Sequence, residues 1–539
     1  MFDYLKRFHY FNGPAGTAEE VDTSGDSEPF YSEKELEDMK LSSDLAVNMD
    51  TVRKIMQNAC DLVVRDIRLG QTASRAAALL YINDLIDSQR IDSDIIRPLI
   101  IDAPASGPVS GDAILNRLNS GDLVTRGQVL PCADMKTLMK GLLTGYACLL
   151  VAGTGASYLF GAKGNETRSI TEPNIEPVIR GPKDSFVESL GVNIALVRTR
   201  LASPNLSFES VEIGTESHTK VCISYLRGVC PPSRVAEVRA RLHRISIDGI
   251  LESGYLEEFI QDSPFSIFPQ VRNTERPDTV AAGLLEGRVA ILTDNTPIAL
   301  IVPGEFFSLL QAAEDYYDRF VFSTFIRIFR FFALLFAAFL PAFYIAVTCY
   351  HRELIPTDLL ISIAQSRVGV PISSVIEAVA MNFALELLYE AGVRLPKSLG
   401  QTISIVGALI IGQAAVQAKL VSPLTVIVIS LTGIATFCIP QYNLVLPLRI
   451  IRFIFMVLAA SFGLFGMMVG MLYLLLYLSS LRSFGVAYLA PIAPFNPDAN
   501  KDMTIRAPWW VLVKRPSYIS ANSNRMRAGQ KPHPPGGGT

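Results

Sequence analysis

The chain has 539 residues, of which half are hydrophobic and only 18% are charged, with a net charge of −3 and a mean hydropathy of +0.32. This length predicts two or three folded units. The near-neutral charge gives no support for nucleic-acid binding. Soluble globular chains carry about 25% charged residues, so the low charged fraction predicts that part of this protein lies in lipid.

The cysteines and the N-terminal residues indicate in which cellular compartment the protein folds. Seven cysteines are scattered along the chain without a C-x-x-C spacing, and Cys222 and Cys230 form the closest pair. We expect reduced thiols in a protein that faces the cytoplasm, with no metal and no cofactor. The first residues lack the continuous apolar core of a secretory signal, so none is expected.

The leader, 1–44, is acidic. Residues 19–38 hold nine carboxylates and one lysine, interspersed with glycine, serine and proline. Such a composition buries too little apolar surface to offset the loss of chain entropy. The leader is therefore predicted to be a disordered tail.

The following region, 45–325, has the mixed pattern of a soluble α/β fold. Two lobes are predicted, 45–165 and 166–325, because a stretch rich in glycine, proline and polar residues lies at 161–177. Residues 234–245 carry apolar side chains at helical spacing, with arginines on the opposite face. Strand-like patterns occur at four places: 61–67, 76–87, 193–201 and 219–226.

The region 326–482 is predicted to be an α-helical polytopic membrane domain. It contains four windows without any charged residue: 331–350, 398–418, 420–448 and 453–481. About 20 apolar residues in a helix cross a bilayer, so each window is a candidate span. A fifth helix at 372–392 carries three glutamates, and we expect it to be re-entrant, interfacial or packed within the bundle.

Basic residues set the expected topology. The tail, 483–539, is basic, and together with Arg482 it holds eight basic residues against two acidic ones. Arg319, Arg327 and Arg330 precede the first window. Both termini are therefore predicted to be cytoplasmic, with four spans, and the end of the tail to be disordered. Arg449 and Arg452 would then lie on the far side, which argues mildly against this arrangement.

The sequence contains no motif of an enzyme, so no catalytic residues are predicted. No phosphate-binding loop, dinucleotide fingerprint, zinc-protease motif or nucleophile elbow occurs.

Polar residues in the membrane region are the candidate functional residues. Gln413 and Gln417 share one helical face, as do Glu386 and Glu390. They could line a pore or gate, or they could serve as interhelical hydrogen bonds and as a solvated helix face. Three glycines, Gly463, Gly466 and Gly470, predict close helix packing.

The stretch SPFSIFPQVRNTERPD, 263–278, is charged and constrained, and it is predicted to be a rigid joint at the end of the soluble region. Its prolines favour extended backbone, and Asp278 is placed as the N-cap of a short helix that ends at Gly287. Paired strands are expected to follow, with a turn at Asp294 and Asn295. The charged residues Arg272, Glu275 and Arg276 could form surface ion pairs or a contact with a neighbouring lobe or subunit.

Extended phrases of the chain resemble the A subunit of the GerA-type germination receptors of endospore-forming bacteria. The resemblance covers about 170–515, and its phrases include EPNIEPVIRGPKDSF, SPFSIFPQVRNTERPD, RELIPTDLLISIAQSRVGVP and SFGVAYLAPIAP. It marks a signature segment that is expected to contact another domain or subunit. The segment comprises Phe268, Pro269, Gln270, Thr274, Glu275, Arg276, Pro277 and Asp278.

The resemblance implies a non-enzymatic, multi-pass receptor component in the inner membrane of the spore. Such a subunit would work with a transporter-like B subunit that binds the nutrient and with a lipoprotein C subunit. It would form a homo-oligomeric, ligand-gated channel that releases monovalent cations. Two alternatives remain at this stage. One is a paralogue that acts with the stage V sporulation dipicolinate channel, and the other is a solute permease in its own right.

Overall fold

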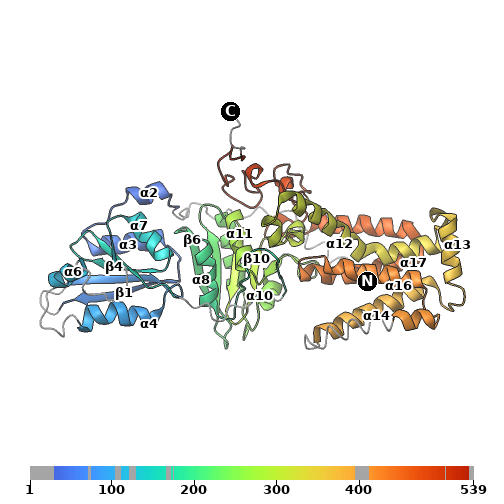
Figure 1. The fold of residues 1–539 in the computed structure, drawn as a ribbon, viewed down its shortest axis with the longest axis horizontal. Coiled ribbons are helices and arrows are strands. Elements are labelled where there is room, and N and C mark those ends of the chain that lie inside the picture. The colour runs from blue at the N-terminus through green and yellow to red at the C-terminus, as the bar shows by residue number, and fades with distance from the viewer. Residues whose placement is uncertain are drawn as a thin grey trace.

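The computed structural model describes residues 30–70, 75–102, 111–119, 129–164, 172–173, 175–394, 412–503 and 505–532. Figure 1 shows three bodies in a row along the longest axis. They are two mixed α and β lobes, here called lobe one and lobe two, and a bundle of long helices. This agrees with the fold class expected from the sequence.

Lobe one is a three-layer unit built on a five-stranded antiparallel sheet in the order β1-β2-β4-β5-β3. Helices α2, α3 and α7 cover one face, and the segments α4, η1, η2 and α6 cover the other. Alternate residues of β2 enter the two cores, as strand geometry requires. The elements are α2 (Glu33–Asp38), α3 (Leu45–Ile55), β1 (Leu62–Leu69), β2 (Arg75–Ile82), α4 (Ser88–Arg90), η1 (Ile91–Ile96), η2 (Pro98–Asp102), α6 (Gly111–Asn119), β3 (Val129–Cys132), α7 (Met135–Leu143), β4 (Tyr146–Val151) and β5 (Ser157–Gly161).

The prediction of a disordered leader is wrong for residues 30–44. Ser32 and Glu35 form a capping box at the start of α2, which satisfies two backbone N–H groups. Leu36 and Leu41 are buried in the core of lobe one. These two leucines pack against the sheet of lobe one. The acidic composition of the leader gives no indication of this packing. Residues 1–29 lie outside the described part of the chain.

Lobe two contains a second five-stranded antiparallel sheet, in the order β6-β7-β9-β10-β8. Helices α8 and α11 cover one face, and α9 and α10 cover the other. The elements are α8 (Leu190–Arg200), β6 (Leu206–Ile213), β7 (Thr219–Leu226), α9 (Pro232–His243), α10 (Ser253–Ile260), β8 (Arg272–Thr274), α11 (Pro277–Glu286), β9 (Val289–Thr293), β10 (Ala299–Val302), η3 (Phe306–Leu310) and η4 (Ala313–Tyr316).

Two local predictions in lobe two are wrong. Residues 193–200 belong to helix α8 instead of a strand, because Leu190, Asn193, Ile194 and Val197 are buried at helical spacing. Asp278 lies inside the first turn of α11, which Pro277 opens at a position where the missing N–H costs nothing. The predicted end of α11 at Gly287 and the strand pair β9 and β10 are confirmed.

The two lobes repeat one topology. When the strands of each sheet are numbered from its own start, both sheets have the order 1-2-4-5-3. In both lobes a helix precedes the first strand, helical segments follow the second, and one helix follows the third. The α/β region is therefore built from two copies of the same three-layer unit.

A buried ion pair joins the two lobes. Asp61, just before β1, receives two hydrogen bonds from Arg198 of α8, at 2.9 and 3.0 Å, and both side chains are almost fully buried. The backbone of Phe208 exchanges hydrogen bonds with Asn58 and Cys60 at 2.9 and 3.0 Å. The lobes thus meet through a desolvated charge pair and a short backbone ladder.

The helical bundle follows lobe two. Its elements are α12 (Phe320–Cys349), η5 (Arg352–Leu354), α13 (Thr357–Ser366), α14 (Ser374–Arg394), α16 (Pro423–Phe437) and α17 (Tyr442–Ser480). Among the described residues, α12 and α17 are long and apolar enough to cross a membrane. Residues 331–349 of the first window lie in α12, and most of the window 398–418 lies outside the described residues.

The window 420–448 is not a single helix. The chain leaves α16 after Phe437 and begins α17 at Tyr442, with Pro440 in the break. Because proline lacks a backbone N–H and disfavours helix in the residue before it, this break is encoded locally. The two helices meet lobe two at this break (Figure 1).

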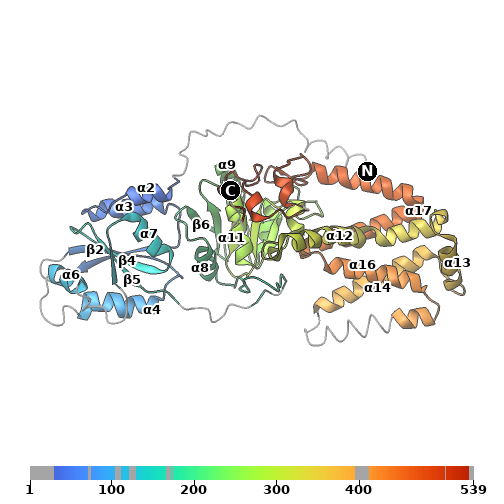
Figure 2. The same ribbon diagram turned by 45° about the horizontal axis from the view of Figure 1, so that its top comes forward.

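Helix α17 reverses direction at Gly463. This residue has φ 61° and ψ −141°, a conformation that only glycine adopts without strain. Gly470 lies against Phe455 and Leu458, whereas 12 residues of straight helix would separate such positions by about 18 Å. The window 453–481 therefore belongs to both limbs of a hairpin, and the second limb returns toward lobe two (Figure 2).

The chain after α17 packs on lobe two. It contains β11 (Arg482–Ser483), β12 (Val486–Ala487), η6 (Ala499–Asp502) and η7 (Trp509–Val511). Arg234 of α9 donates to the carbonyl oxygens of Gly287 and Ile519 at 2.8 and 2.5 Å. Arg525 forms an ion pair with Glu286 at 3.0 Å. The described part of the predicted basic tail is thus folded against lobe two, and residues 533–539 lie outside the described residues.

Candidate functional site

Arg452 is the central polar residue of the bundle. It lies on the first limb of α17 and is completely buried. Its guanidinium donates to the carbonyl oxygen of Ala337 on α12 at 2.7 Å and to Thr436 Oγ1 on α16 at 3.1 Å. It also donates to Asn382 Oδ1 and Glu386 Oε1 on α14, at 3.1 and 3.3 Å. One side chain therefore connects all four major helices.

Glu386 is shared between two arginines. Its second oxygen lies 3.5 Å from Arg449, one turn before Arg452, and the Arg449 guanidinium stacks 4.6 Å from the ring of Tyr389. Tyr389 in turn donates to the carbonyl oxygen of Gly433 at 3.0 Å. We call the set Asn382, Glu386, Tyr389, Thr436, Arg449 and Arg452 the bundle cluster.

The bundle cluster carries two positive charges and one negative charge in an apolar environment. Charged groups in a membrane segment are costly and are retained where they pair or line a water-filled path. The amide nitrogen of Asn382 is buried without a hydrogen-bond partner, so the cluster contains a hydrogen-bond donor that is not used. Such an arrangement can hold the helices in one packing and can also contact an ion or water.

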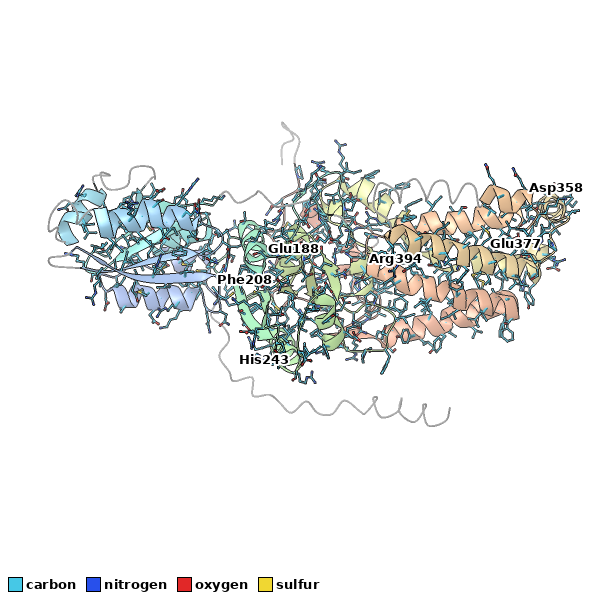
Figure 3. All side chains as sticks on the ribbon, turned by 90° about the horizontal axis from the view of Figure 1, so that it is seen from below. Glu188, Phe208, His243, Asp358, Glu377 and Arg394 are labelled. Atoms are coloured by element: carbon cyan, nitrogen blue, oxygen red, sulfur yellow. The ribbon has the colours of Figure 1, made fainter. Side chains whose placement is uncertain are left out.

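A second buried carboxylate lies at the end of the bundle remote from lobe two. Glu377, in the first turn of α14, is completely buried, accepts a hydrogen bond from the backbone N–H of Ser422 and lies 3.5 Å from Arg367. Figure 3 places Glu377 at this end and Arg394 at the end near lobe two. Helix α14 therefore runs back toward the soluble lobes.

The candidate pore residues are not all brought together. Glu386 lies in the bundle cluster, but Glu390 is exposed and pairs with Arg394, one turn away on the same helix. Gln413 and Gln417 are exposed. Arg449 and Arg452 were interpreted from the sequence only as topology signals. Their position within an otherwise apolar stretch was the available signal for an intramembrane role.

The candidate packing glycines have two different roles. Gly463 forms the reversal itself, where the side chains of Tyr350 and His351 would lie 2.9 Å from an added Cβ. Gly466 and Gly470 face the first limb of α17, where Leu458 leaves no room for a side chain.

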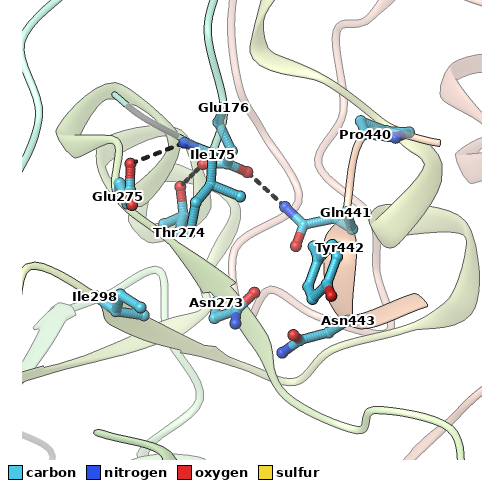
Figure 4. Close-up of a pocket in the computed structure, with 10 residues that line it drawn as sticks. All are labelled: Ile175, Glu176, Asn273, Thr274, Glu275, Ile298, Pro440, Gln441, Tyr442 and Asn443. Atoms are coloured by element: carbon cyan, nitrogen blue, oxygen red, sulfur yellow. Dashed lines mark hydrogen bonds between the residues drawn. The ribbon is translucent and has the colours of Figure 1, made fainter. Parts of the chain in front are cut away.

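A joint between lobe two and the bundle lies around Glu176. Its carboxylate accepts from Thr274 Oγ1 at 2.5 Å and from Gln441 Nε2, in the loop between α16 and α17, at 2.6 Å (Figure 4). A cavity of about 50 Å³ lies beside these residues. Burial raises the pKa of the Glu176 carboxyl, although Arg272 opposes this effect. The joint is therefore polar and desolvated.

The signature segment contacts several other parts of the same chain. The Phe268 ring lies 6.3 Å from those of Tyr477 and Tyr488, and Tyr488 donates to the carbonyl oxygen of Pro269 at 2.8 Å. Ser483 donates to the carbonyl oxygen of Gln270 at 2.6 Å. The segment therefore lies between lobe two, the second limb of α17 and the residues that follow it.

The charged end of the signature segment is buried. The guanidinium of Arg276 is 1% exposed, bonds both oxygens of Asp278 and donates to the carbonyl oxygen of Pro182 at 2.9 Å. Tyr317, just before α12, donates to Asp278. Glu275 is also buried and accepts from the backbone N–H of Ile175 at 3.3 Å. These residues fix the entry of the chain into α12.

Two arginines at the start of α12 are neutralised. Arg327 pairs with Asp315 at 3.1 Å and with Asp502 at 2.9 Å, and Arg330 pairs with Asp315 at 2.7 Å. Burial raises the pKa of the Asp502 carboxyl, against the lowering effect of Arg327. The positive charges of Arg327 and Arg330 are therefore engaged in ion pairs within the protein.

The described residues contain no group of three or more histidine, cysteine, aspartate or glutamate side chains that could hold a metal ion. The fold and the bundle cluster together define a membrane protein in which a duplicated α/β region is joined to a helical bundle. The more particular assignment comes from comparison with known proteins.

Residues 50–518 match the family model of the Bacillus/Clostridium GerA spore germination protein. The chain is 40% identical to spore germination protein KA of Bacillus subtilis over 92% of this chain and 90% of the relative. It is 39% identical to spore germination protein B1 of the same species, over 90% of this chain and 99% of the relative. The chain therefore belongs to the GerA family, as a spore germination receptor A subunit.

Two further similarities were found. The uncharacterised membrane protein YfkQ of Bacillus subtilis is 42% identical over 92% of this chain and 96% of the relative. The crystal structure of the N-terminal domain of the A subunit of the Bacillus megaterium spore germinant receptor GerK3 is 35% identical. It covers 50% of this chain and 97% of the solved chain, with a TM-score of 0.40.

Proposed function

We propose that this A subunit forms a ligand-gated path for monovalent cations in the inner membrane of the spore. The observation that supports this proposal is the bundle cluster, in which one buried arginine joins four helices. A change in helix packing must break or re-form its charge pairs, which gives the bundle two discrete states. In this proposal both termini are cytoplasmic and several copies of the chain surround the path.

The partners belong to the same proposal. A transporter-like B subunit binds the nutrient, and a lipoprotein C subunit completes the receptor. Ligand binding on the B subunit favours one packing of the bundle. The joint at Glu176 and the signature segment connect the soluble lobes to the bundle, so the lobes set the resting state.

Potassium efflux from lipid vesicles tests the role of the bundle cluster. The full-length chain is reconstituted at equal density into potassium-loaded vesicles as wild type, Glu386→Ala or Glu386→Gln. Removing the carboxylate leaves Arg449 and Arg452 without their charge partner and shifts the packing equilibrium. We expect Glu386→Ala to change the efflux rate at least about tenfold, which corresponds to about 1.4 kcal/mol between two states. Glu386→Gln retains an acceptor and should have a smaller effect.

Glu390→Ala is the matched control, since Glu390 is exposed on the same helix. Its efflux should equal that of the wild type. Equal efflux from all variants and from empty vesicles would contradict the proposal. The pair Gln413→Leu and Gln417→Leu tests the remaining candidates, because unchanged efflux would remove these glutamines from the path.

A further inference from the structure

Two loop tips of lobe two carry large apolar side chains that are almost fully exposed. Phe265 is 98% exposed and Ile179 is 97% exposed, whereas the next most exposed large hydrophobic residue described, Phe437, is 76% exposed. Isolated exposed apolar residues are common on soluble proteins. The ordered turn that carries Phe265 and the position of both tips distinguish them.

The Phe265 tip is a fixed turn. The backbone N–H of Ser266 donates to the carbonyl oxygen of Ser263 at 3.0 Å. The side chain of Gln270, itself 1% exposed, bonds both the N–H and the carbonyl oxygen of Ser263 at 2.9 Å. Pro264 restricts the backbone further. The phenyl ring is therefore presented by an ordered loop, so contact with a partner costs little additional ordering.

Both tips lie beside the end of an apolar helix. Phe268 packs against Tyr477 near the end of α17, and the three residues from Phe265 to Phe268 span at most about 11 Å. Near Ile179, Gly181 lies against the ring of Tyr317, three residues before α12 begins. The two tips approach the bundle at two different helices but at the same end. Two tips at different helices are consistent with contact to a lipid surface that surrounds the bundle.

The electrostatic surroundings permit contact with lipid. The segment from Ser263 to Ile267 has no charged residue, and the preceding Asp262 is paired with Arg241. Beside Ile179, Arg180 is largely exposed and lies 3.9 Å from Asp318. Apolar side chains next to span ends are typical of the boundary between water and the acyl chains.

We propose that Phe265 and Ile179 insert into the headgroup boundary of the leaflet that faces the lobes, and so hold lobe two against the bilayer. The outward face of α12 continues this apolar surface into the membrane, with Phe325 64% and Phe329 53% exposed. The anchor would transmit movements between lobe two and the lipid surface without passing through the joint at Glu176.

Photo-cross-linking of the full-length chain in nanodiscs of phosphatidylcholine and phosphatidylglycerol tests this anchor. Benzoylphenylalanine replaces Phe265 or Ile179, and in the control it replaces Val47 of lobe one, which is 51% exposed. All three positions are exposed, so the fold tolerates the probe. After illumination, intact mass should show lipid adducts at positions 265 and 179 at least about fivefold above the control.

Two results would overturn the proposal. Lipid adducts at position 265 no more abundant than at position 47 would mean that the tip does not reach the bilayer. Adducts between two chains in place of lipid adducts would assign the tip to an interface between copies.

Discussion

At the scale of single residues, Glu257 on α10 links the stability of lobe two to pH. Burial, and then the nearby charge of Glu252, raise the pKa of its carboxyl to about 7 from an ordinary value of 4.5. The protonated form is therefore favoured in the folded chain. Its contribution to stability is complete below about pH 4.5 and is lost as the pH rises through about 7.

The variant Glu257→Gln tests this pH dependence, because glutamine has the shape of the protonated acid. Between pH 5 and pH 8, the melting temperature of the wild type should fall relative to that of Glu257→Gln. The expected fall is about 2–4 °C for each kcal/mol lost. Thermal unfolding of the purified full-length protein measures it. Glu258→Gln, at the exposed neighbouring position, is the control, and parallel curves for all three proteins would refute the assignment.

At the scale of elements, the reversal in α17 decides the architecture of the bundle. Without it, 39 helical residues would extend about 58 Å, far beyond the apolar core of a bilayer. Gly463 permits the reversal because it has no Cβ and adopts a positive φ. The first limb then carries Arg449 and Arg452 into the bundle, and the second limb returns the chain to lobe two.

The variant Gly463→Ala should therefore prevent normal assembly of the bundle. The added methyl group meets Tyr350 and His351 at 2.9 Å and forces a strained backbone, at a cost of about 1–3 kcal/mol from the backbone alone. Gly392→Ala in α14 is the matched control, since nothing lies within 4 Å of an added Cβ there. The yield of monodisperse protein and its melting temperature should fall for Gly463→Ala only. Equal behaviour of the two variants would exclude a required reversal.

At the scale of the whole molecule, the C-terminal segment closes a loop between the bundle and lobe two. The guanidinium of Arg234 donates to the carbonyl oxygens of both Gly287 and Ile519. In addition, the backbone N–H of Ala521 donates to the carbonyl oxygen of Val229 at 2.9 Å. These contacts hold the chain that follows the second limb of α17 against lobe two. This segment therefore connects the hairpin to α9 and α11 of lobe two.

The variant Arg234→Met should release this segment, because methionine keeps the apolar stem but cannot donate to carbonyl groups. Hydrogen exchange of the backbone around residues 515–525 should accelerate at least about tenfold, which corresponds to about 1.4 kcal/mol of local opening. Arg244→Met, at an exposed position that follows α9, is the control. Exchange that is unchanged in Arg234→Met would mean that other contacts hold the segment.

Local sequence pattern was sufficient for many elements. The strand runs of β1, β2 and β7, the helix α9, and the turn from β9 to β10 follow from periodicity and turn residues. Helix α8 was not predicted because its buried face includes Asn193 and Arg198. These residues are polar, so they do not contribute to a hydrophobic pattern with helical spacing. The packed residues 30–44 were missed because two buried leucines carry little weight in an acidic composition.

Composition and periodicity were sufficient to predict a mixed α and β region followed by apolar helices, and the long phrases of the sequence indicated the family. These properties depend on composition, periodicity and local order. The repeated topology of the two lobes, and the contact of Arg452 with Glu386, 66 residues away, could be seen in the folded chain alone. A buried charge takes the partner that folding brings within reach, and the spacing of residues along the chain does not specify that partner.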